Sequence, residues 1–172
     1  AQIDDFSTNY PTCTNPKYLF INGTGASPAI TNLTGLSSIT QVVNKLIISN
    51  TSITDLSALS NLTQIGDTLQ LDHNALMTSI GLSNLTQLGA IIFLDLPLLT
   101  SIAGLSNTID TIGAVNIDST ALSNLNGLDG IVHINGAGGF GLRIAHTPIV
   151  NLSSLTNLTT IQGYMILEHN PS

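Results

Sequence analysis

Three aspartates recur at a fixed interval, and they are the first residues whose spacing suggests chemistry. Asp72, Asp95 and Asp118 are equally spaced along the sequence. If that interval forms one turn of a stacked coil, their carboxylates lie about 4.8 Å apart on successive coils. Like charges at that distance repel each other, and a cation such as Ca²⁺ would relieve the repulsion; the alternative is a row of solvated carboxylates. Because each coil offers one carboxylate and the G-G-x-G-x-D calcium repeat is absent, we expect no bound metal and no cofactor.

Histidines are the second set of residues with the chemistry of metal ligands. His146 and His169 are separated by the same interval as the aspartates, and His73 takes the equivalent place in an earlier repeat. Neutral imidazole is a common metal ligand, but two imidazoles without a third ligand make a poor site. Each of these histidines lies where the chain is predicted to turn. We therefore expect them to be wide polar turn residues.

The chain lacks the residue sets that enzymes use. Cleavage of a polysaccharide needs paired carboxylates or a base beside the substrate, and here the carboxylates recur at a structural interval. Arg143 has no obvious partner, no G-x-S-x-G motif occurs, and the single cysteine, Cys13, lies near one end outside the repeats. We predict that the protein is not an enzyme. A carbohydrate-active enzyme is the less favoured alternative.

Composition excludes two classes of partner. Only 8% of the 172 residues are charged, against roughly 25% in ordinary soluble domains, and the net charge is −7 with three basic residues. Such a chain has no positive surface for nucleic acid or for anionic lipid. It also has no run of about 18 apolar residues that would span a bilayer. We therefore predict no nucleic-acid partner and no membrane insertion.

Leucines repeat at the same constant interval and indicate the architecture. One column contains Leu36, Leu59, Leu82, Leu105 and Leu128. A second column has the same interval, with a longer step across the glycine-rich stretch 135–141: Leu46, Leu69, Ile92, Val115, Leu142 and Met165. Between these columns apolar residues come at every third position, which suits short 3-10 or extended turns better than an α-helix.

Around the second column the sequence alternates with period two, as a strand with one buried face does. Leu69-Gln70-Leu71 and Ile92-Phe93-Leu94 are examples. We predict a mainly β protein: a right-handed leucine-rich-repeat-like solenoid of about six to seven 23-residue coils, with one parallel sheet and short turns or 3-10 segments on the other side. Residues 1–16 are expected to form an N-terminal cap segment. Residues 17–172 are expected to form a single repeat solenoid that is truncated at its C-terminus.

A polar column follows each strand and should hydrogen-bond the backbone of the neighbouring coil. Its members are Thr24, Thr51, Asn74, Pro97, Thr120, Thr147 and Asn170. Strand and turn together resemble the L-x-L-x-x-N segment of leucine-rich repeats, most clearly in TQIGDTLQLDHN and TTIQGYMILEHN. The resemblance covers residues 17–172. It departs from the common form because Thr or Pro stands at most of the Asn positions.

The N-terminal stretch QIDDFSTNYPTCTNPKYLFING, followed by ITNLTGLSSIT, resembles the opening of secreted repeat modules that are common in marine Bacteroidetes and related to receptor L-domains. That resemblance implies an exported, surface-associated protein with other domains in a longer parent chain. The outward aromatic residues of the strands, which can stack on sugar or protein, predict a polysaccharide or protein ligand at the cell surface. We therefore expect a secreted or cell-surface location.

One residue of each strand should point outward and line the sheet face, where repeat proteins usually bind. The predicted row is Phe20, Ile47, Gln70, Phe93, Asn116, Arg143 and Ile166. We place binding at Phe93, supported by Gln70, Asn116 and Arg143, with Phe140 in the glycine-rich loop as a second candidate. The alternative is that these side chains merely favour strands and pack on one another. The predicted function is a non-catalytic extracellular binding or adhesion module.

An ice-binding or other surface-binding protein is the alternative function. Low charge, many threonines and stacked coils are compatible with it. Ice binding requires a flat array of identical small hydroxyl residues, whereas the predicted strand row mixes Phe, Gln, Asn and Arg. Thr40, Thr63, Thr86 and Thr159 recur on the connecting arc, but Asp110 interrupts them.

The phrase Ser-Asn-Leu-Thr also recurs, and its asparagines have the sequence context of glycosylation acceptors. They are Asn61, Asn84 and, in the variant Thr-Asn-Leu-Thr, Asn157. The leucines of the phrase fit the core, and its polar residues fit the turns between. We interpret the phrase as the construction unit of a solenoid.

Overall fold

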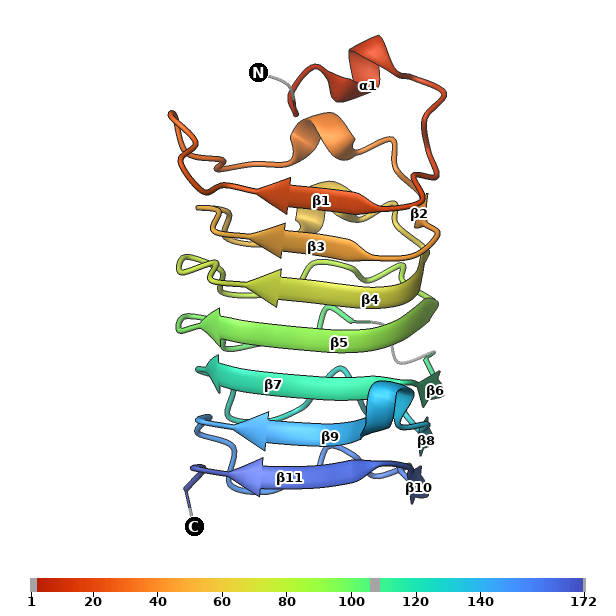
Figure 1. Ribbon diagram of the computed structural model, residues 1–172, viewed down its shortest axis with the longest axis vertical. Helices are drawn as coiled ribbons and strands as arrows, with labels where there is room; N and C mark the ends of the chain where they lie inside the picture. The colour runs from red at the N-terminus through yellow and green to blue at the C-terminus, as the bar shows by residue number, and fades with distance from the viewer. Residues whose placement is uncertain (1–2, 106–108, 172) are drawn as a thin grey trace.

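A ladder of parallel strands forms one side of the molecule (Figure 1). The computed structural model describes residues 3–105 and 109–171. Along the main sheet the order follows the chain: β1 (Leu19–Asn22), β3 (Leu46–Ser49), β4 (Gln64–Asp72), β5 (Gln87–Leu96), β7 (Ala114–Thr120), β9 (Phe140–Ala145) and β11 (Tyr164–Glu168). The short strand β2 (Gln41–Val42) pairs with β4 as the eighth member. The predicted mainly β solenoid with a coil of about 23 residues is confirmed.

The return path of each coil is made of turns and short elements. A second, three-stranded parallel sheet contains β6 (Thr111–Ile112), β8 (His133–Ile134) and β10 (Thr160–Ile161). Within the described residues, 3-10 segments lie on this path at Thr34–Leu36 and Ser57–Leu59, and a third, Ala137–Gly139, lies in the glycine-rich insertion before β9. The helix α1 (Phe6–Asn9) lies beyond β1 at the N-terminal end of the stack (Figure 1). The short turns and 3-10 segments agree with the period of three in the sequence.

The core is a stack of aliphatic layers. All five leucines of the first predicted column are buried, and so are the residues at every third position between them, such as Ile53, Leu56 and Leu62. Burying a leucine or isoleucine stabilises a fold by about 1.5–3 kcal/mol. Because each coil repeats the same set, these layers form one continuous core from Ile21 to Leu155.

The pairing register of strand β5 departs from the 23-residue repeat. Ile65 pairs with Leu88, 23 positions on, but Leu69 pairs with Ile91, which is 22 positions on. Two residues separate Leu88 from Ile91, whereas three separate Ile65 from Leu69. The pairing of β5 with β7 then runs 24 positions on, which restores the average.

This shift overturns the predicted exposure of Phe93. A slip of one residue moves every side chain of a strand to the opposite face. Phe93 therefore points into the core, where it is 0% exposed, and Ile92 lies on the sheet face between Gln70 and Asn116. The segment 91–94 is apolar at four successive positions, so its alternation did not reveal the slip.

The same shift corrects the predicted row of three aspartates. Leu94, and not Asp95, pairs with both Asp72 and Asp118, so an apolar residue separates the two carboxylates. Asp95 lies one position later, still within β5, and has a left-handed φ of 52°. Pro97 is displaced in the same way, because Leu96 pairs with Thr120.

Six coils of the described chain have a residue with left-handed backbone geometry at or directly after the C-terminal end of the strand. The φ angles lie between 50° and 55° at Asn50, His73, Asp95, Ser119, His146 and His169. Asn, Asp and His enter this region more readily than most residues. The histidines are therefore turn residues, as predicted.

Asparagine side chains join one coil to the next. The Oδ1 atom of buried Asn74 accepts hydrogen bonds from the backbone N–H (3.0 Å) and the hydroxyl (2.6 Å) of Thr51, and its Nδ2 donates to the carbonyl of Ile48 (2.8 Å). Asn170 makes the same contacts with Thr147 and Ile144. The predicted role of this column is confirmed at these two positions.

The asparagines and threonines of the repeated phrase Ser-Asn-Leu-Thr also hydrogen-bond one coil to the next. The Nδ2 atoms of Asn61, Asn84 and Asn157 donate to backbone carbonyls of the preceding coil at 2.9, 2.8 and 2.7 Å. The threonine two positions later also donates its hydroxyl backwards, as Thr63 does to the Thr40 carbonyl (3.1 Å). The asparagines thus pair with carbonyl groups of the turns, whereas the threonine hydroxyl adds a second hydrogen bond to a carbonyl that already accepts a backbone N–H.

A pair of adjacent substitutions tests the register of β5. Phe93→Ala removes a fully buried ring, and we expect the free energy of unfolding to fall by about 3–5 kcal/mol. Ile92→Ala shortens a side chain on the sheet face, and we expect a loss of about 1 kcal/mol. Urea unfolding followed by circular dichroism measures both. A larger loss for Ile92→Ala than for Phe93→Ala would contradict the register.

Candidate functional site

The sheet face carries the central row of outward side chains. In register, the row is Phe20, Ile47, Gln70, Ile92, Asn116, Arg143 and Ile166. All but one of the residues predicted for this row lie in it; Ile92 replaces Phe93. The middle of the row alternates aliphatic and amide side chains, which are partly buried by their neighbours in adjacent strands. Phe20, at the N-terminal end, is 61% exposed.

Aromatic side chains lie on the surface. The chain has three tyrosines and four phenylalanines, all within its described part, and five of these are exposed: Tyr10, Tyr18, Phe20, Phe140 and Tyr164. Four of the five lie at the two ends of the main sheet. The sequence pattern did not single out Tyr18 or Tyr164, although each directly precedes the first inward residue of a strand.

The N-terminal pair forms a small aromatic platform. The rings of Tyr18 and Phe20 stack with centroids 5.7 Å apart and an interplanar angle of 26°. The Lys17 ammonium lies 5.7 Å from the centre of the Tyr18 ring. A cation at this distance is attracted to the face of the ring. The platform therefore combines two apolar rings with one of the three cations of the chain.

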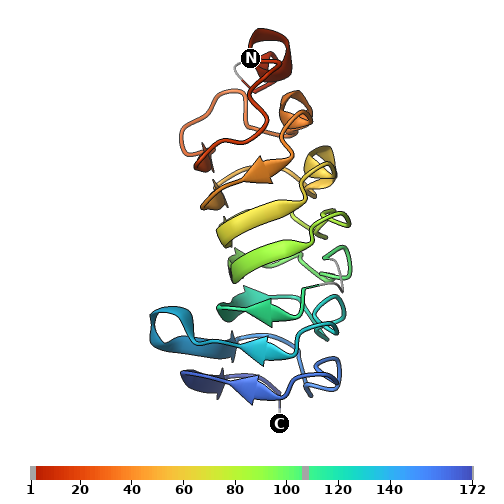
Figure 2. The same ribbon diagram turned by 90° about the vertical axis from the view of Figure 1, so that its right-hand side faces the viewer.

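The C-terminal pair lies beside the glycine-rich insertion. Phe140 begins β9, and Tyr164, which begins β11, pairs with it. Gly136 and Gly138 both have φ of 67°, which lets segment 135–141 fold back tightly before the strand. Figure 2 shows this segment standing out from the stack on the side of the main sheet. Phe140 is exposed, as the prediction of a binding loop requires.

Arg143 has partners on both neighbouring strands. Its Nη1 donates to Asp118 Oδ2 (2.8 Å) and Asn116 Oδ1 (3.2 Å), and its Nη2 and Nε donate to Glu168 Oε1 (2.7 and 3.1 Å). The guanidinium thus bridges β7, β9 and β11, with its side chain 20% exposed. The sequence showed no partner for it because both carboxylates are distant along the chain and lie on other strands.

The hydrogen bonds between Arg143 and its partners favour the ionised forms of Asp118 and Arg143. Burial alone would raise the pKa of Asp118, but hydrogen bonds from Arg143, His146 and Ser119 outweigh it and hold that pKa below its ordinary value. The hydrogen bond to Asp118, although opposed by burial, raises the pKa of Arg143. This network joins the last three strands of the main sheet. Arg143 is therefore a structural cation as well as a member of the sheet face.

Imidazole rings stack at the same end of the molecule. The rings of His146 and His169 lie 4.6 Å apart and 6° from parallel. His146 Nδ1 is 2.9 Å from Asp118 Oδ1. The equal spacing of these histidines thus places their rings on adjacent coils, and the pair extends the polar network around Arg143.

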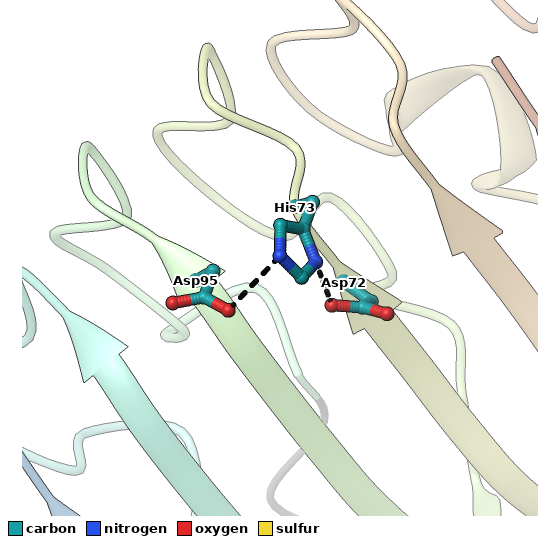
Figure 3. A group of neighbouring side chains, drawn as sticks. All are labelled: Asp72, His73 and Asp95. Atoms are coloured by element: carbon teal, nitrogen blue, oxygen red, sulfur yellow. Dashed lines mark hydrogen bonds and ion pairs between the residues drawn. The ribbon is translucent and has the colours of Figure 1, made fainter. Parts of the chain in front are cut away.

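A second polar cluster lies where β4 and β5 end (Figure 3). His73 Nδ1 contacts Asp72 Oδ1, and His73 Nε2 lies 3.3 Å from Asp95 Oδ2. Within the described residues, this is the group of three side chains whose potential metal-ligand atoms all lie within 4.8 Å of one another. Asp72 and Asp95 were predicted as weak metal candidates; Asp118, the third, lies with Arg143 instead.

Exchange of Arg143 for methionine should weaken the C-terminal coils. Arg143→Met keeps much of the length of the side chain but removes its charge-assisted hydrogen bonds, and we expect the free energy of unfolding to fall by about 1–3 kcal/mol. The matched control is Lys45→Met, whose pairing with Asp67 at 3.7 Å is exposed. We expect Lys45→Met to lower the free energy of unfolding by less than about 0.5 kcal/mol.

At acid pH, Arg143→Met should lower the free energy of unfolding by less than it does at neutral pH. The pKa of Asp118 is lowered in the folded state. The ionised Asp118 carboxylate therefore stabilises the fold fully above its pKa in the unfolded chain, about 3.9. This stabilisation is lost as the pH falls through the lower pKa of the folded state. The stability difference between wild type and Arg143→Met should be largest near neutral pH and should narrow below about pH 4. A difference that grows in acid would contradict the assigned network.

Comparison with protein-family models, with curated proteins and with solved structures gave no match. Among the described residues, no helix has the length and apolar character needed to cross a membrane. The similarity to secreted leucine-rich-repeat modules stays a prediction. What the chain does must therefore be inferred from its own surface.

Proposed function

We propose that the protein is a non-catalytic binding or adhesion module that presents its main sheet face to a polysaccharide or protein ligand. One observation carries this proposal: four exposed aromatic side chains flank the sheet, Tyr18 and Phe20 at one end and Phe140 and Tyr164 at the other. Exposed aromatic rings are unfavourable in water and are typical of binding hot spots. Their flat apolar faces stack on sugar rings or on apolar side chains.

The dimensions of the face favour an extended ligand. β1 and β11 are separated by six strand-to-strand steps. Those steps span about 29 Å at ~4.8 Å per step. Between the two aromatic pairs lie Gln70 and Asn116, whose amides donate and accept hydrogen bonds. A polymer chain or a protein surface can contact both ends at once, whereas a small molecule would reach one end.

The polar groups of the face support a non-catalytic role. On the sheet face, Arg143 is paired with both Asp118 and Glu168. Acid–base catalysis needs such groups within reach of a substrate proton. A secreted or cell-surface location belongs to the same proposal, because it is implied by the resemblance of the N-terminal stretch.

Ice binding, the alternative function, has less support. The threonines of the arc donate their hydroxyls to the backbone of the preceding coil, as Thr63 and Thr86 do at 3.1 Å. Asp110 and Val132 interrupt this row in later coils. A regular array of hydroxyls along the whole stack is therefore missing from the described arc.

Removal of the exposed rings tests the proposed function. The chain is screened by affinity electrophoresis in gels that contain β-glucan, xylan, pectin or alginate, and by pull-down against cell-surface protein extracts. For the ligand found, Tyr18→Ala with Phe20→Ala, or Tyr164→Ala, should weaken binding about tenfold or more. Val150→Ala, which alters an exposed apolar residue outside the main sheet, should leave binding unchanged. Equal affinity of all three variants and wild type would contradict the proposal.

A further inference from the structure

We propose that His73 and Asp95 bind a divalent transition-metal ion of the Zn²⁺ class, and that Asp72 orients the imidazole for that purpose. The three residues lie at the ends of β4 and β5, on the edge of the sheet where the coils turn (Figure 3). The site is separate from the aromatic pairs and does not depend on the proposed binding of a polymer or protein.

The spacing of the two donor atoms suits a shared metal ion. His73 Nε2 and Asp95 Oδ2 are 3.3 Å apart. A tetrahedral zinc ion with bonds of about 2.0–2.1 Å holds adjacent ligand atoms about 3.3–3.4 Å apart. The ion can therefore contact both atoms after small side-chain rotations.

Asp72 supplies the outer contact that metal-binding histidines usually have. Such histidines donate their second ring N–H to a carboxylate or carbonyl, which fixes the tautomer and the ring orientation. His73 Nδ1 faces Asp72 Oδ1, so in the metal-bound form the carboxylate would accept the Nδ1–H and the Nε2 lone pair would bind the ion beside Asp95. Imidazole with carboxylate selects Zn²⁺, Ni²⁺ or Cu²⁺ over Ca²⁺, which prefers six to eight oxygen ligands.

The backbone holds the two ligands on a rigid base. His73 and Asp95 have the same left-handed geometry, with φ of 52°, in consecutive coils. The His73 N–H donates to the Leu94 carbonyl at 3.0 Å, and the next residue, Asn74, is fully buried. The side chains of His73 and Asp95 are 59% and 52% exposed, so water can complete the coordination.

The other histidines show what distinguishes this position. His146 has the same backbone geometry, but the next coil offers the ring of His169 in place of a carboxylate. His133 contacts the hydroxyl of Thr160 at 2.8 Å. Within the described residues, which include all four histidines of the chain, His73 alone has a carboxylate at each ring nitrogen.

Titration with zinc chloride tests the site. Untagged protein is used with Cys13→Ser, because the exposed thiol would compete for zinc. Isothermal calorimetry should give one zinc ion per chain, and in proton NMR the ring signals of His73 should shift first among the four histidines. His73→Gln and Asp95→Asn should abolish this binding, and Asp72→Asn should weaken it about tenfold.

His146→Gln is the matched control and should bind zinc as the parent does. Zinc binding that is lost in His146→Gln and kept in His73→Gln would overturn the proposal. So would unchanged His73 signals at millimolar zinc in the Cys13→Ser protein, a result that does not depend on whether any ligand variant folds.

Discussion

The parallel backbone ladder between successive coils is the constraint on which the other features of the molecule depend. In a strand, side chains alternate between the two faces, so the pairing of one coil with the next decides which residues enter the core and which reach the surface. The aliphatic layers reinforce this pairing, and the asparagine and threonine side chains of the turns satisfy the backbone groups that strands leave open. A surface so poor in charge is possible because most polar contacts run from one coil to its neighbour.

The centre of the sheet face and the polar cluster at His73 both depend on the slip in β5. With one residue fewer before the central part of β5, Phe93 enters the core and Ile92 joins the sheet face. The face therefore has aliphatic and amide side chains at its centre and aromatic rings at its ends. The same shift places Asp95 near the end of β5 at a residue with left-handed backbone geometry, where it meets His73 in place of Asp72. A break in the repeat thus creates a mixed imidazole and carboxylate group that an unbroken repeat would not contain.

The sequence predicted what depends on strict periodicity. The leucine column, the turn asparagines and the stacked histidines all keep the constant interval, and the structure has them as predicted. It could not predict the slip in β5, because four successive apolar residues, 91–94, fit either register. The partners of Arg143 were missed for a related reason: they lie on neighbouring strands, and the glycine-rich insertion lengthens the interval between two of those strands. Exposure of Tyr18 and Tyr164 depends on the ends of strands, which alternation does not define.

Disulfide trapping measures the register of β5 most directly. In the Cys13→Ser background, Gln70→Cys is combined either with Ile92→Cys or with Phe93→Cys, and the fraction of intramolecular disulfide is measured by mass spectrometry after mild oxidation. Paired residues on adjacent strands are about 4.8 Å apart, within the range of about 4.4–6.8 Å that a disulfide spans. Gln70 pairs with Ile92, so the first combination should form the disulfide and the second should stay reduced. A disulfide in the second combination and none in the first would restore the unbroken repeat register and contradict both the sheet face and the metal site described above.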